Sequence, residues 1–305
     1  MISIIIPTLN GGELFSRVLE SIAIQEITDE YELLVYDSAS TDHTVKSAKS
    51  FGAEVVHIER NDFDHGSTRT LAAKKAVGDI LVFMTQDAII TGSDSLASLI
   101  QPLKANEYSS VAVTYGRQLP RIDAAPAAAH LRLFNYPSES IVRTIEDKHK
   151  YGLKTVFVSN SFAAYTKTVL AANCYFDNGL IFGEDTCAVG RILLDGYGIQ
   201  YVAEATVCHS HNFTFVEEFK RHFDIGVLHS AENWLLQEYG VAEGHGASYV
   251  RSAFSYFLKN KVWYLIPDLI IRCGAKYVGY KLGKEYQSLP IELRSKLSQH
   301  HAWWR

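Results

Sequence analysis

Short apolar segments recur four times in the first 90 residues of this chain, and each ends abruptly on polar residues. They occupy residues 3–6, 31–36, 54–58 and 80–84. Between them, three segments place apolar side chains at helical spacing, at residues 13–24, 44–51 and 68–77. This alternation predicts an α/β fold with a doubly wound, mostly parallel sheet and helices on both faces.

The segment 78–88 is the strongest signal in the chain. After Gly78 it is uninterrupted in apolar character to Met84, which is typical of a strand buried on both faces. It then ends on Thr85, Gln86 and Asp87, and in an extended chain Thr85 and Asp87 project to the same side. In open α/β sheets, ligands bind at the carboxyl ends of the strands, which is where Asp87 is expected to lie. The alternative is that Asp87 caps the next helix.

The pattern is less regular after Asp87. We expect a helix at residues 95–104, a strand at 111–115, a long excursion at 119–150, β structure at 155–165 and 200–208, and a helix at 185–194. From residue 214 the pattern is mainly helical and aromatic-rich. We therefore expect one catalytic domain over residues 1–212 and a helical region over residues 213–305.

Composition narrows the class of protein. With 305 residues, 47% hydrophobic and 21% charged, the chain is typical of a globular protein with a large core. Met1 leads directly into an apolar strand, so we expect no signal peptide, and the run at 262–271 is too interrupted to span a bilayer. The four cysteines show no C-x-x-C spacing, which favours reduced thiols in the cytoplasm.

Charge is distributed unevenly along the chain. Residues 251–305 contain ten Lys/Arg and three Asp/Glu, whereas the whole chain has a net charge of −5. A basic tail on an acidic body suggests contact with an anionic surface, although a solvated helical face explains the count equally well. Because the basic character is confined to the tail, we do not expect nucleic-acid binding.

Polar side chains follow each of the early strands. The first loop, 8–12, is not a G-x-G-x-x-G, so a dinucleotide-binding enzyme is disfavoured. Asp37, at the end of the second strand, suits a nucleobase imide or a ribose hydroxyl, and turn formation is the alternative. Arg69 lies in the first turn of a helix that Ser67 is placed to cap, where its guanidinium can meet a phosphate.

Two further groups offer acid–base and metal chemistry. Glu184 and Asp185 begin a helix, where they either satisfy its dipole or provide a general base. His209 and His211 lie on one face of an extended segment. Together with Asp87 they predict a sparsely held Mg²⁺ or Mn²⁺, whose remaining ligands are the oxygens of a diphosphate.

These motifs, in this order, resemble the family-2 inverting glycosyltransferases of the GT-A fold. The resemblance rests on residues 5–10, 37–42, 183–185 and the acid after residues 82–84, and it spans about the first 210 residues. More narrowly, residues 63–69, 85–88, 209–212, 219–226 and 279–284 look like the bacterial rhamnosyltransferase branch. The implied activity is transfer of L-rhamnose from dTDP-β-L-rhamnose to a glycan acceptor, lipid-linked or an oligosaccharide, in cell-surface (O-antigen-like) polysaccharide synthesis.

The resemblance implies a role for each matching residue. Asp185 is the expected catalytic base, Glu184 lies on the acceptor side, and Asp87 with His209 and His211 holds the metal. The expected donor-binding residues are Pro7, Thr8, Asn10, Asp37, Ser40, Asp64, Arg69, Thr85, Gln86 and Asp87.

The chain departs from the family at one position, because Thr85-Gln86-Asp87 stands where D-x-D is usual. Without the first carboxylate of D-x-D, the histidines become more important as metal ligands. An acid that commonly lies near the ribose is also lost, which suits a donor that contains deoxyribose. A UDP-sugar donor on the same fold and a metal-dependent hydrolase using Asp87, His209 and His211 remain open, as does a non-catalytic sugar-nucleotide module. For the basic tail we expect peripheral contact with the inner face of the cell membrane, and a homo-oligomer interface is the alternative.

Overall fold

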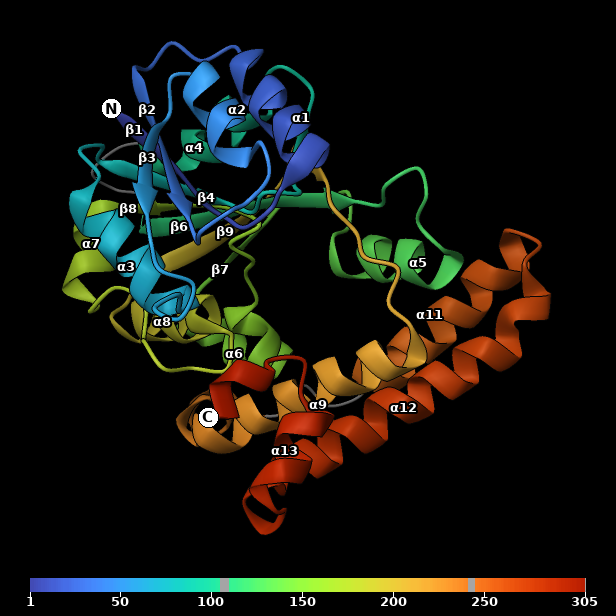
Figure 1. The fold of residues 1–305 in the computed structure, drawn as a ribbon. Helices are drawn as coiled ribbons and strands as arrows, with labels where there is room; N and C mark the ends of the chain where they lie inside the picture. The colour runs from blue at the N-terminus through green and yellow to red at the C-terminus, as the bar shows by residue number, and fades with distance from the viewer. Residues whose placement is uncertain (105–109, 241–244, 305) are drawn as a thin grey trace.

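The computed structural model describes residues 1–104, 110–240 and 245–304. A mixed sheet lies at its centre, in the order β3-β2-β1-β4-β8-β6-β9-β5, with β7 paired to β9 (Figure 1). Its strands are β1 (Ile2–Thr8), β2 (Tyr31–Asp37), β3 (Glu54–His57), β4 (Ile80–Met84), β5 (Ile89–Thr91), β6 (Val111–Leu119), β7 (Ile141–Arg143), β8 (Phe162–Thr166) and β9 (Gly198–Cys208).

Thirteen α-helices and several 3₁₀ turns surround the sheet within the described residues. The helices are α1 (Gly12–Ala23), α2 (Thr44–Ser50), α3 (His65–Lys75), α4 (Ser95–Lys104), α5 (Pro126–Asn135), α6 (Lys148–Tyr151), α7 (Lys167–Ala172), α8 (Glu184–Leu194), α9 (Phe215–Ala231), α10 (Asn233–Tyr239), α11 (His245–Lys259), α12 (Ile266–Lys284) and α13 (Ile291–Leu297). The 3₁₀ turns are η1 (Ile145–Asp147), η2 (Gly152–Val156), η3 (Trp263–Leu265), η4 (Tyr286–Ser288) and η5 (His301–Trp304).

The first four strands form the parallel half of the sheet, as the sequence predicts. β1 pairs in parallel with both β2 and β4, and β2 pairs in parallel with β3. β8 then runs antiparallel to β4 and β6, while β6 and β9 are parallel. The prediction of a doubly wound, mostly parallel sheet with a helical C-terminal region is therefore confirmed, and β5, β7 and β8 run in the reverse direction.

Side chains that alternate along the strands form two cores, one on each face of the sheet. Ile4 and Val82 pack with α1, α2 and α4 on one face. Ile5 and Phe83 pack with α3, α7, α8 and α9 on the other. All five residues of β4 are buried, which matches the continuous apolar run that predicts a strand covered on both sides.

Several predicted details are wrong. Residues 155–161 form the end of a 3₁₀ turn and a loop, and the strand begins at Phe162. Helix α3 begins at His65, because the Asp64 carboxylate, rather than Ser67, caps it by accepting the Ser67 N–H at 2.7 Å. Thr85 and Asp87 lie at a turn in which Ala88 N donates to Thr85 O at 3.2 Å, so these two residues are not in extended chain.

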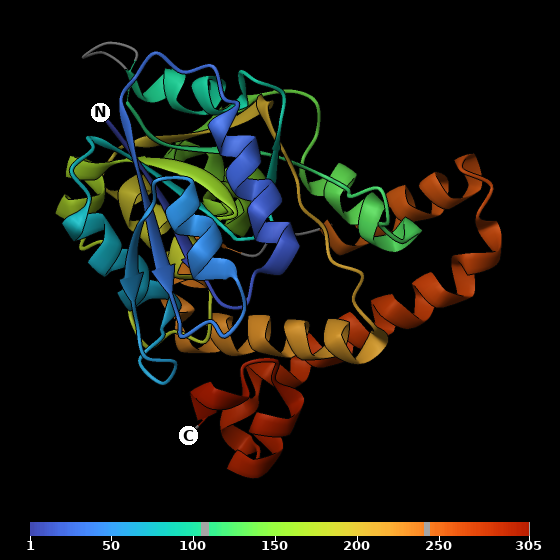
Figure 2. The same cartoon turned by 45° about the horizontal axis from the view of Figure 1, so that its top comes forward.

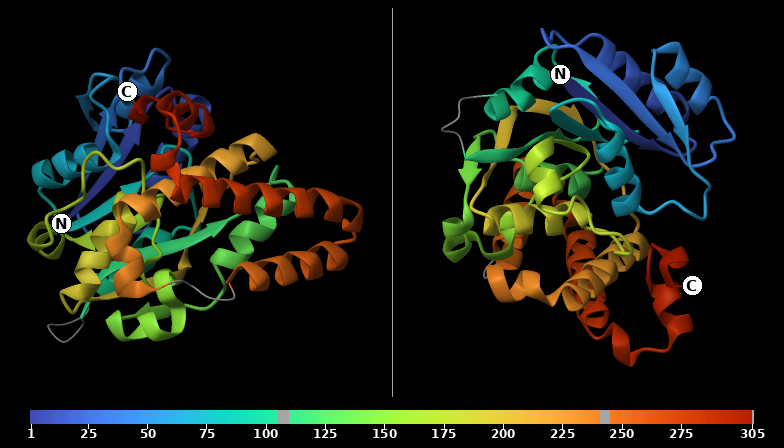
Figure 3. Two further views of the ribbon diagram at one scale, coloured as in Figure 1. Left: turned by 90° about the horizontal axis from the view of Figure 1, so that it is seen from below. Right: turned by 90° about the vertical axis from the view of Figure 1, so that its left-hand side faces the viewer.

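Glycines allow α9 and α12 to pack at very short range. A Cβ on Gly279 would lie 2.4 Å from the carbonyl oxygen of Phe219, and one on Gly283 would lie 2.0 Å from that of Phe223. The reverse holds for Gly226, whose Cβ would meet Tyr280 O at 2.3 Å. The segments 219–226 and 279–284 are therefore the two sides of one helix–helix contact, seen from below in Figure 3.

Beyond this contact, α11 and α12 form a hairpin that projects away from the sheet (Figures 1 and 2). A small core of Ala253, Phe257 and Leu269 holds its two helices together. Its inner side meets α5, where His130 Nε2 and Ser252 Oγ are 3.0 Å apart. None of the helices in residues 1–104, 110–240 and 245–304 is both long and apolar enough to cross a membrane.

Candidate active site

The loops after β1 and β2 are tied together by the side chains predicted to bind a nucleotide. Asp37 is buried and accepts hydrogen bonds from Thr8 Oγ1 at 3.2 Å and from Ser40 N at 3.0 Å. Asn10 accepts the Thr41 N–H at 2.8 Å, and its own N–H donates to Ser40 Oγ at 2.8 Å. Asp37, Asn10 and Ser40 therefore shape the two loops by protein–protein bonds.

Gln86 connects the end of β4 to the loop after β1. Its Oε1 accepts the Leu9 N–H at 2.8 Å, and its Nε2 donates to Leu9 O at 3.1 Å. Both polar groups of the Gln86 amide are therefore used to join the end of β4 to the loop after β1.

Asp87 meets the two imidazoles at the carboxyl edge of the sheet. Its Oδ2 lies 3.4 Å from His209 Nε2 and 3.6 Å from His211 Nε2, and the two Nε2 atoms are 3.1 Å apart. Burial alone would raise the pKa of Asp87, but the bond to His209 and the charges of both imidazoles hold that pKa well below its usual range. One oxygen and two nitrogens therefore converge on a single point.

Gln118 fixes the orientation of the His209 ring through the Nδ1 atom of that ring. This Nδ1 lies 2.9 Å from Gln118 Oε1, an oxygen that also accepts a 2.6 Å bond from Arg132 Nη1. That oxygen can only accept, so Nδ1 of His209 carries a proton and the Nε2 atom faces Asp87. Burial and the neighbouring His209 lower the pKa of His211 to about 4, so the His211 imidazole is neutral at pH 7. This is the donor set expected for a divalent cation.

Two arginines that the sequence did not single out flank the imidazoles. Arg132 reaches His209 through Gln118. Arg221 lies over the Phe213 ring at 5.7 Å, and Phe213 in turn stacks on His211 at 5.4 Å. Surrounding protein atoms and the charge of Arg132 lower the pKa of Arg221, which has no carboxylate within ion-pair distance among the described residues. Positive charge on both sides of the cluster favours an anionic ligand.

Asp185 is the second residue of α8, and Gly183, whose φ of 82° provides the sharp entry into the helix, lies two positions before it. Its Oδ2 accepts the Asn160 N–H at 3.2 Å and its Oδ1 accepts the Thr186 N–H at 2.7 Å. Burial, and then the charge of Glu184, raise the pKa of Asp185 to about 6. A carboxylate with this pKa is suited to act as a general base near neutral pH.

Glu184 and Arg69 form a buried ion pair. Arg69 Nη1 lies 2.8 Å from Glu184 Oε1, and both side chains are less than 8% exposed. Burial alone would raise the pKa of Glu184, but Arg69 and then His65 lower it overall. The sequence predicts that the Glu184 carboxylate lies on the acceptor side. In the structure this carboxylate instead faces Arg69 inside the protein. The Arg69 guanidinium, predicted to meet phosphate, already has a carboxylate partner.

Asp87 and Asp185 belong to the same edge of the sheet. Thr85 N donates to Ser161 O at 3.4 Å, and Asn160, the residue before Ser161, is the one that bonds to Asp185. The charge of Arg221 acts on both His211 and Asp185. Asp185 is thus linked to the end of β4 through residues 160 and 161, and its role as the base stays a prediction.

A cavity of about 890 Å³ opens beside these groups. Of the predicted donor residues, those that line it are Pro7, Thr8, Asp64, Arg69, Thr85, Gln86 and Asp87. Asp37, Asn10 and Ser40 lie behind its wall, and Asp185 and the imidazoles are not among its lining residues. Sequence reasoning missed the remaining lining residues: Leu9, Ser38, Arg60, Asn61, Phe63, His65, Leu180, Ile181, His300, Ala302 and Trp303. Arg60 and Asn61 could have been found from the sequence, because they closely follow the third predicted strand. No sequence pattern indicates that residues 300–303 reach the cavity.

A family model and known proteins match this chain. The family model described as glycosyl transferase family 2 matches residues 3–173. The O-antigen chain rhamnosyltransferase RfbN of Salmonella typhimurium is 42% identical over 309 residues, covering 99% of this chain and 96% of RfbN. The O-antigen chain rhamnosyltransferase WbaN of Salmonella anatum is 39% identical, covering 99% of this chain and 95% of WbaN.

Solved structures show the same fold at low sequence identity. The mannosyltransferase PcManGT of Pyrobaculum calidifontis, determined with GDP-Man and Mn²⁺, has a TM-score of 0.60 at 18% identity, covering 97% of this chain and 84% of that chain. Staphylococcus aureus TarS 1–349 with UDP-GlcNAc has a TM-score of 0.54 at 15% identity, covering 94% of this chain and 91% of that chain.

Proposed function

The chain belongs to glycosyl transferase family 2 and is a glycosyltransferase, and from this premise we propose that it transfers L-rhamnose from dTDP-β-L-rhamnose to a glycan acceptor, with inversion, in O-antigen-like polysaccharide synthesis. Two rhamnosyltransferases that match nearly the full chain support the choice of sugar. One arrangement carries the proposal: Asp87 lines the cavity, His209 and His211 lie beside its carboxylate, and Asp185, whose pKa is raised, is joined to the end of β4 through residues 160 and 161.

The residues at the cluster fit a bound divalent cation. Asp87, His209 and His211 offer ligand atoms that all lie within 4.8 Å of one another. Two imidazole nitrogens suit Mn²⁺ better than Mg²⁺, which strongly prefers oxygen. Held there, such a cation would neutralise negative charge on a leaving diphosphate.

Asp185 is the group placed to start the reaction. It takes a proton from an acceptor hydroxyl, and that oxygen forms a bond to the anomeric carbon from the face opposite the diphosphate. The bond between the anomeric carbon and the diphosphate oxygen breaks, and dTDP leaves with both electrons of that bond. General-base assistance of this kind contributes roughly 10²–10⁴ in rate.

Arg221 and Arg132, rather than Arg69, supply protein charge to the departing diphosphate in this proposal. Arg69 Nη1 is bonded to Glu184 and lies within 3.1 Å of His65 Nδ1, so its task is to hold the amino ends of α3 and α8 together. Arg221 has no such partner within the described residues, and its side chain still reaches solvent. Asp37, Asn10 and Ser40 fix the two loops against which the nucleoside lies.

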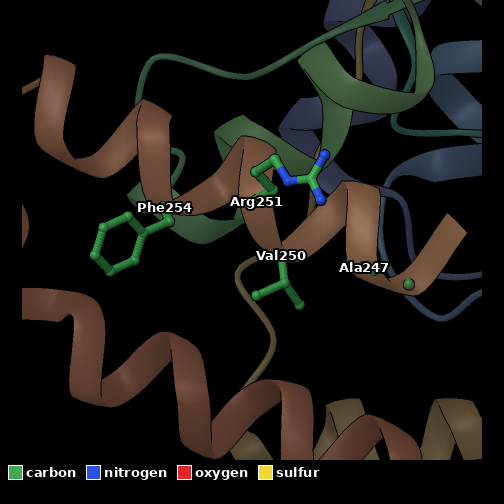
Figure 4. A pocket seen from close by; sticks show the side chains of 5 residues that line it. Ala247, Val250, Arg251 and Phe254 are labelled. Atoms are coloured by element: carbon green, nitrogen blue, oxygen red, sulfur yellow. The ribbon is translucent and has the colours of Figure 1, made fainter. Parts of the chain in front are cut away.

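The α11–α12 hairpin is the proposed contact with the inner face of the cell membrane, where a lipid-linked acceptor would reside. Exposed apolar side chains cover it: Val250, Phe254, Leu258, Trp263, Tyr264, Ile270 and Ile271. Figure 4 shows Val250, Arg251 and Phe254 projecting from α11 around a shallow hollow. Trp263 and Tyr264 lie beside the exposed Lys259 and Lys261, a combination typical of membrane interfaces.

Two basic residues of the C-terminal region, Arg272 and Lys276, are held in ion pairs within the protein. Arg272 is paired with Glu218 at 3.0 Å and Asp268 at 2.6 Å, and Lys276 is paired with Glu218 at 3.2 Å. Arg272 and Lys276 hold α12 against α9. Fewer of the ten Lys and Arg residues in 251–305 are therefore free to contact a membrane.

The decisive experiment combines binding with transfer. Calorimetric titration with dTDP, UDP and GDP in the presence of Mn²⁺ should show the tightest binding for dTDP. A transfer assay with dTDP-rhamnose should form product only when a glycan acceptor is present. Release of free rhamnose at the same rate without acceptor would identify a hydrolase, and tighter binding of UDP would overturn the assigned donor.

A further inference from the structure

The last residues of the chain lie against the cavity that holds the predicted donor residues, although more than 200 positions separate them from β4. Trp303 Nε1 donates to Gly179 O at 2.8 Å, and Gly179 N donates to Asp64 Oδ2 at 3.3 Å. The C-terminal turn is thereby joined to the loop before α8 and to the cap of α3. Figure 3 shows this red segment reaching back toward the blue strands.

The neighbouring Trp304 anchors this turn. Its indole is 8% exposed and lies 6.3 Å from the Phe223 ring and 5.7 Å from the Tyr286 ring, centroid to centroid. Asp224 Oδ2 accepts the Gln299 N–H at 2.9 Å. Because Phe223 and Asp224 belong to α9, the turn is fixed to the helix that also carries Arg221.

The residues that line the cavity fall into two chemical sets. The polar set includes Thr8, Ser38 and Asp87 at the ends of β1, β2 and β4, and also Arg60, Asn61, Asp64, His65 and Arg69. The apolar and aromatic set comes from three separate segments: Phe63, Leu180, Ile181, His300, Ala302 and Trp303. His300 stacks on Phe182 at 6.1 Å, and burial lowers its pKa to about 4, so its imidazole is uncharged at pH 7.

A nucleoside diphosphate needs polar partners, so in this inference the apolar and aromatic set is left for the sugar. A 6-deoxyhexose carries a methyl group where ordinary hexoses carry a hydroxymethyl, and burying that methyl against apolar atoms is favourable. A buried hydroxyl at the same place would lose its water without gaining a partner. An apolar wall therefore discriminates in favour of the deoxy sugar.

We propose that the C-terminal turn, residues 298–304, is the sugar-selective wall of the donor site, with Trp303 packing on the apolar face and methyl group of the hexosyl ring and His300 bonding to a ring hydroxyl. This inference rests on the proposed function. It assigns donor selectivity to a segment that lies outside the residues matched by the family model.

The test compares Trp303→Ala with the wild-type chain by calorimetry, using dTDP and dTDP-rhamnose as separate ligands. We expect affinity for dTDP-rhamnose to fall about tenfold, equivalent to ~1.4 kcal/mol, while affinity for dTDP changes less than about twofold. Trp303→Phe, which keeps a ring but loses the bond to Gly179, should lie between the two. Trp263→Ala, an exposed tryptophan on the distant hairpin, is the matched control and should bind both ligands as the wild type does.

The selectivity itself is measured with dTDP-glucose, which carries the C6 hydroxyl. The wild type should prefer dTDP-rhamnose, and Trp303→Ala should lose most of that preference. Equal weakening of dTDP and dTDP-rhamnose, or no change in either, would overturn the role of the turn. A wild-type protein that binds no dTDP ligand would instead overturn the proposed function, so the two failures are distinguishable.

Discussion

The Nε2 atoms of His209 and His211 lie 3.1 Å apart, and both are directed at the same oxygen of Asp87. Two imidazole nitrogens at this distance either share one proton or both bind a cation. The bond between His209 Nδ1 and Gln118 Oε1 holds the Nε2 atom of His209 toward Asp87. The arrangement is therefore ready for a metal before any ligand arrives.

We expect His209→Ala and Asp87→Asn each to raise the Mn²⁺ concentration needed for half-maximal transfer by at least roughly 10–100-fold, the range for losing a residue that only supports a metal ligand. The measurement is a Mn²⁺ titration of initial rates at saturating donor. His43→Ala, which removes an imidazole outside the described cluster, is the control and should leave the titration unchanged. An unaltered titration for Asp87→Asn would place the cation elsewhere.

The raised pKa of Asp185 predicts a pH dependence of the reaction. A general base acts when it is deprotonated, so kcat should fall as the pH drops through about 6 and should be constant above it. Asp185→Asn should lower kcat by roughly 10²–10⁴ and remove this acid limb, while dTDP affinity stays near wild type. Asp79→Asn, at a side chain 90% exposed, is the control. A wild-type acid limb that persists in Asp185→Asn would assign the limb to another group.

Much of the parallel half of the fold follows from sequence pattern alone. The run from Ile80 to Met84 could be placed because burial on both faces leaves no polar position in a strand. The reversal at β8 could not, because a short strand between two loops reads the same in either direction. The cap at Asp64 was missed for a similar reason: Ser67 and Asp64 are both good caps, and only tertiary contacts decide between them.

The candidate site likewise combines residues that the sequence predicts with residues that it does not. Asp87, His209 and His211 could be grouped from the sequence because strand ends of an α/β sheet converge at one edge. The bond between Arg69 and Glu184 joins residues 115 positions apart, and no local pattern encodes such a pairing. Trp303 is further removed still, since its position depends on how α9, α12 and α13 carry the chain back to the sheet.

The buried pair between Arg69 and Glu184 should be important for stability. Glu184→Gln leaves the Arg69 guanidinium without its carboxylate inside the protein, and we expect a loss of about 3–5 kcal/mol in the free energy of unfolding. Denaturant unfolding measures it. The exposed pair of Lys75 and Glu54 provides the control, since Glu54→Gln should cost less than about 1 kcal/mol. Equal effects at the two sites would show that Arg69 finds another partner.

Membrane contact through the hairpin predicts a specific sedimentation result. The wild type should co-sediment with vesicles containing anionic lipid, and added salt should weaken that binding. Trp263→Ala combined with Tyr264→Ala should reduce the bound fraction several-fold, because interfacial aromatic side chains would be lost. Trp303→Ala, away from the hairpin, should bind as the wild type does. Binding unaffected by the paired substitution, with dimers seen by light scattering, would favour a protein interface instead.

Helix α12 contains its own control for the packing of α9 against it. A Cβ at Gly283 would lie 2.0 Å from Phe223 O, whereas a Cβ at Gly274 would meet nothing within 4 Å. Alanine is the better helix former, so Gly274→Ala should stabilise the protein by up to about 1 kcal/mol. Gly283→Ala gains the same helix propensity but forces the two helices apart, so we expect it to be destabilising overall.

Gly283→Ala should also weaken the binding of dTDP-rhamnose. Phe223 contacts Trp304, so displacement of α9 from α12 should disturb the C-terminal turn. Thermal unfolding of both variants, with calorimetry of the folded proteins, checks this; stabilisation by both alanines would show that the close helix contact is not required.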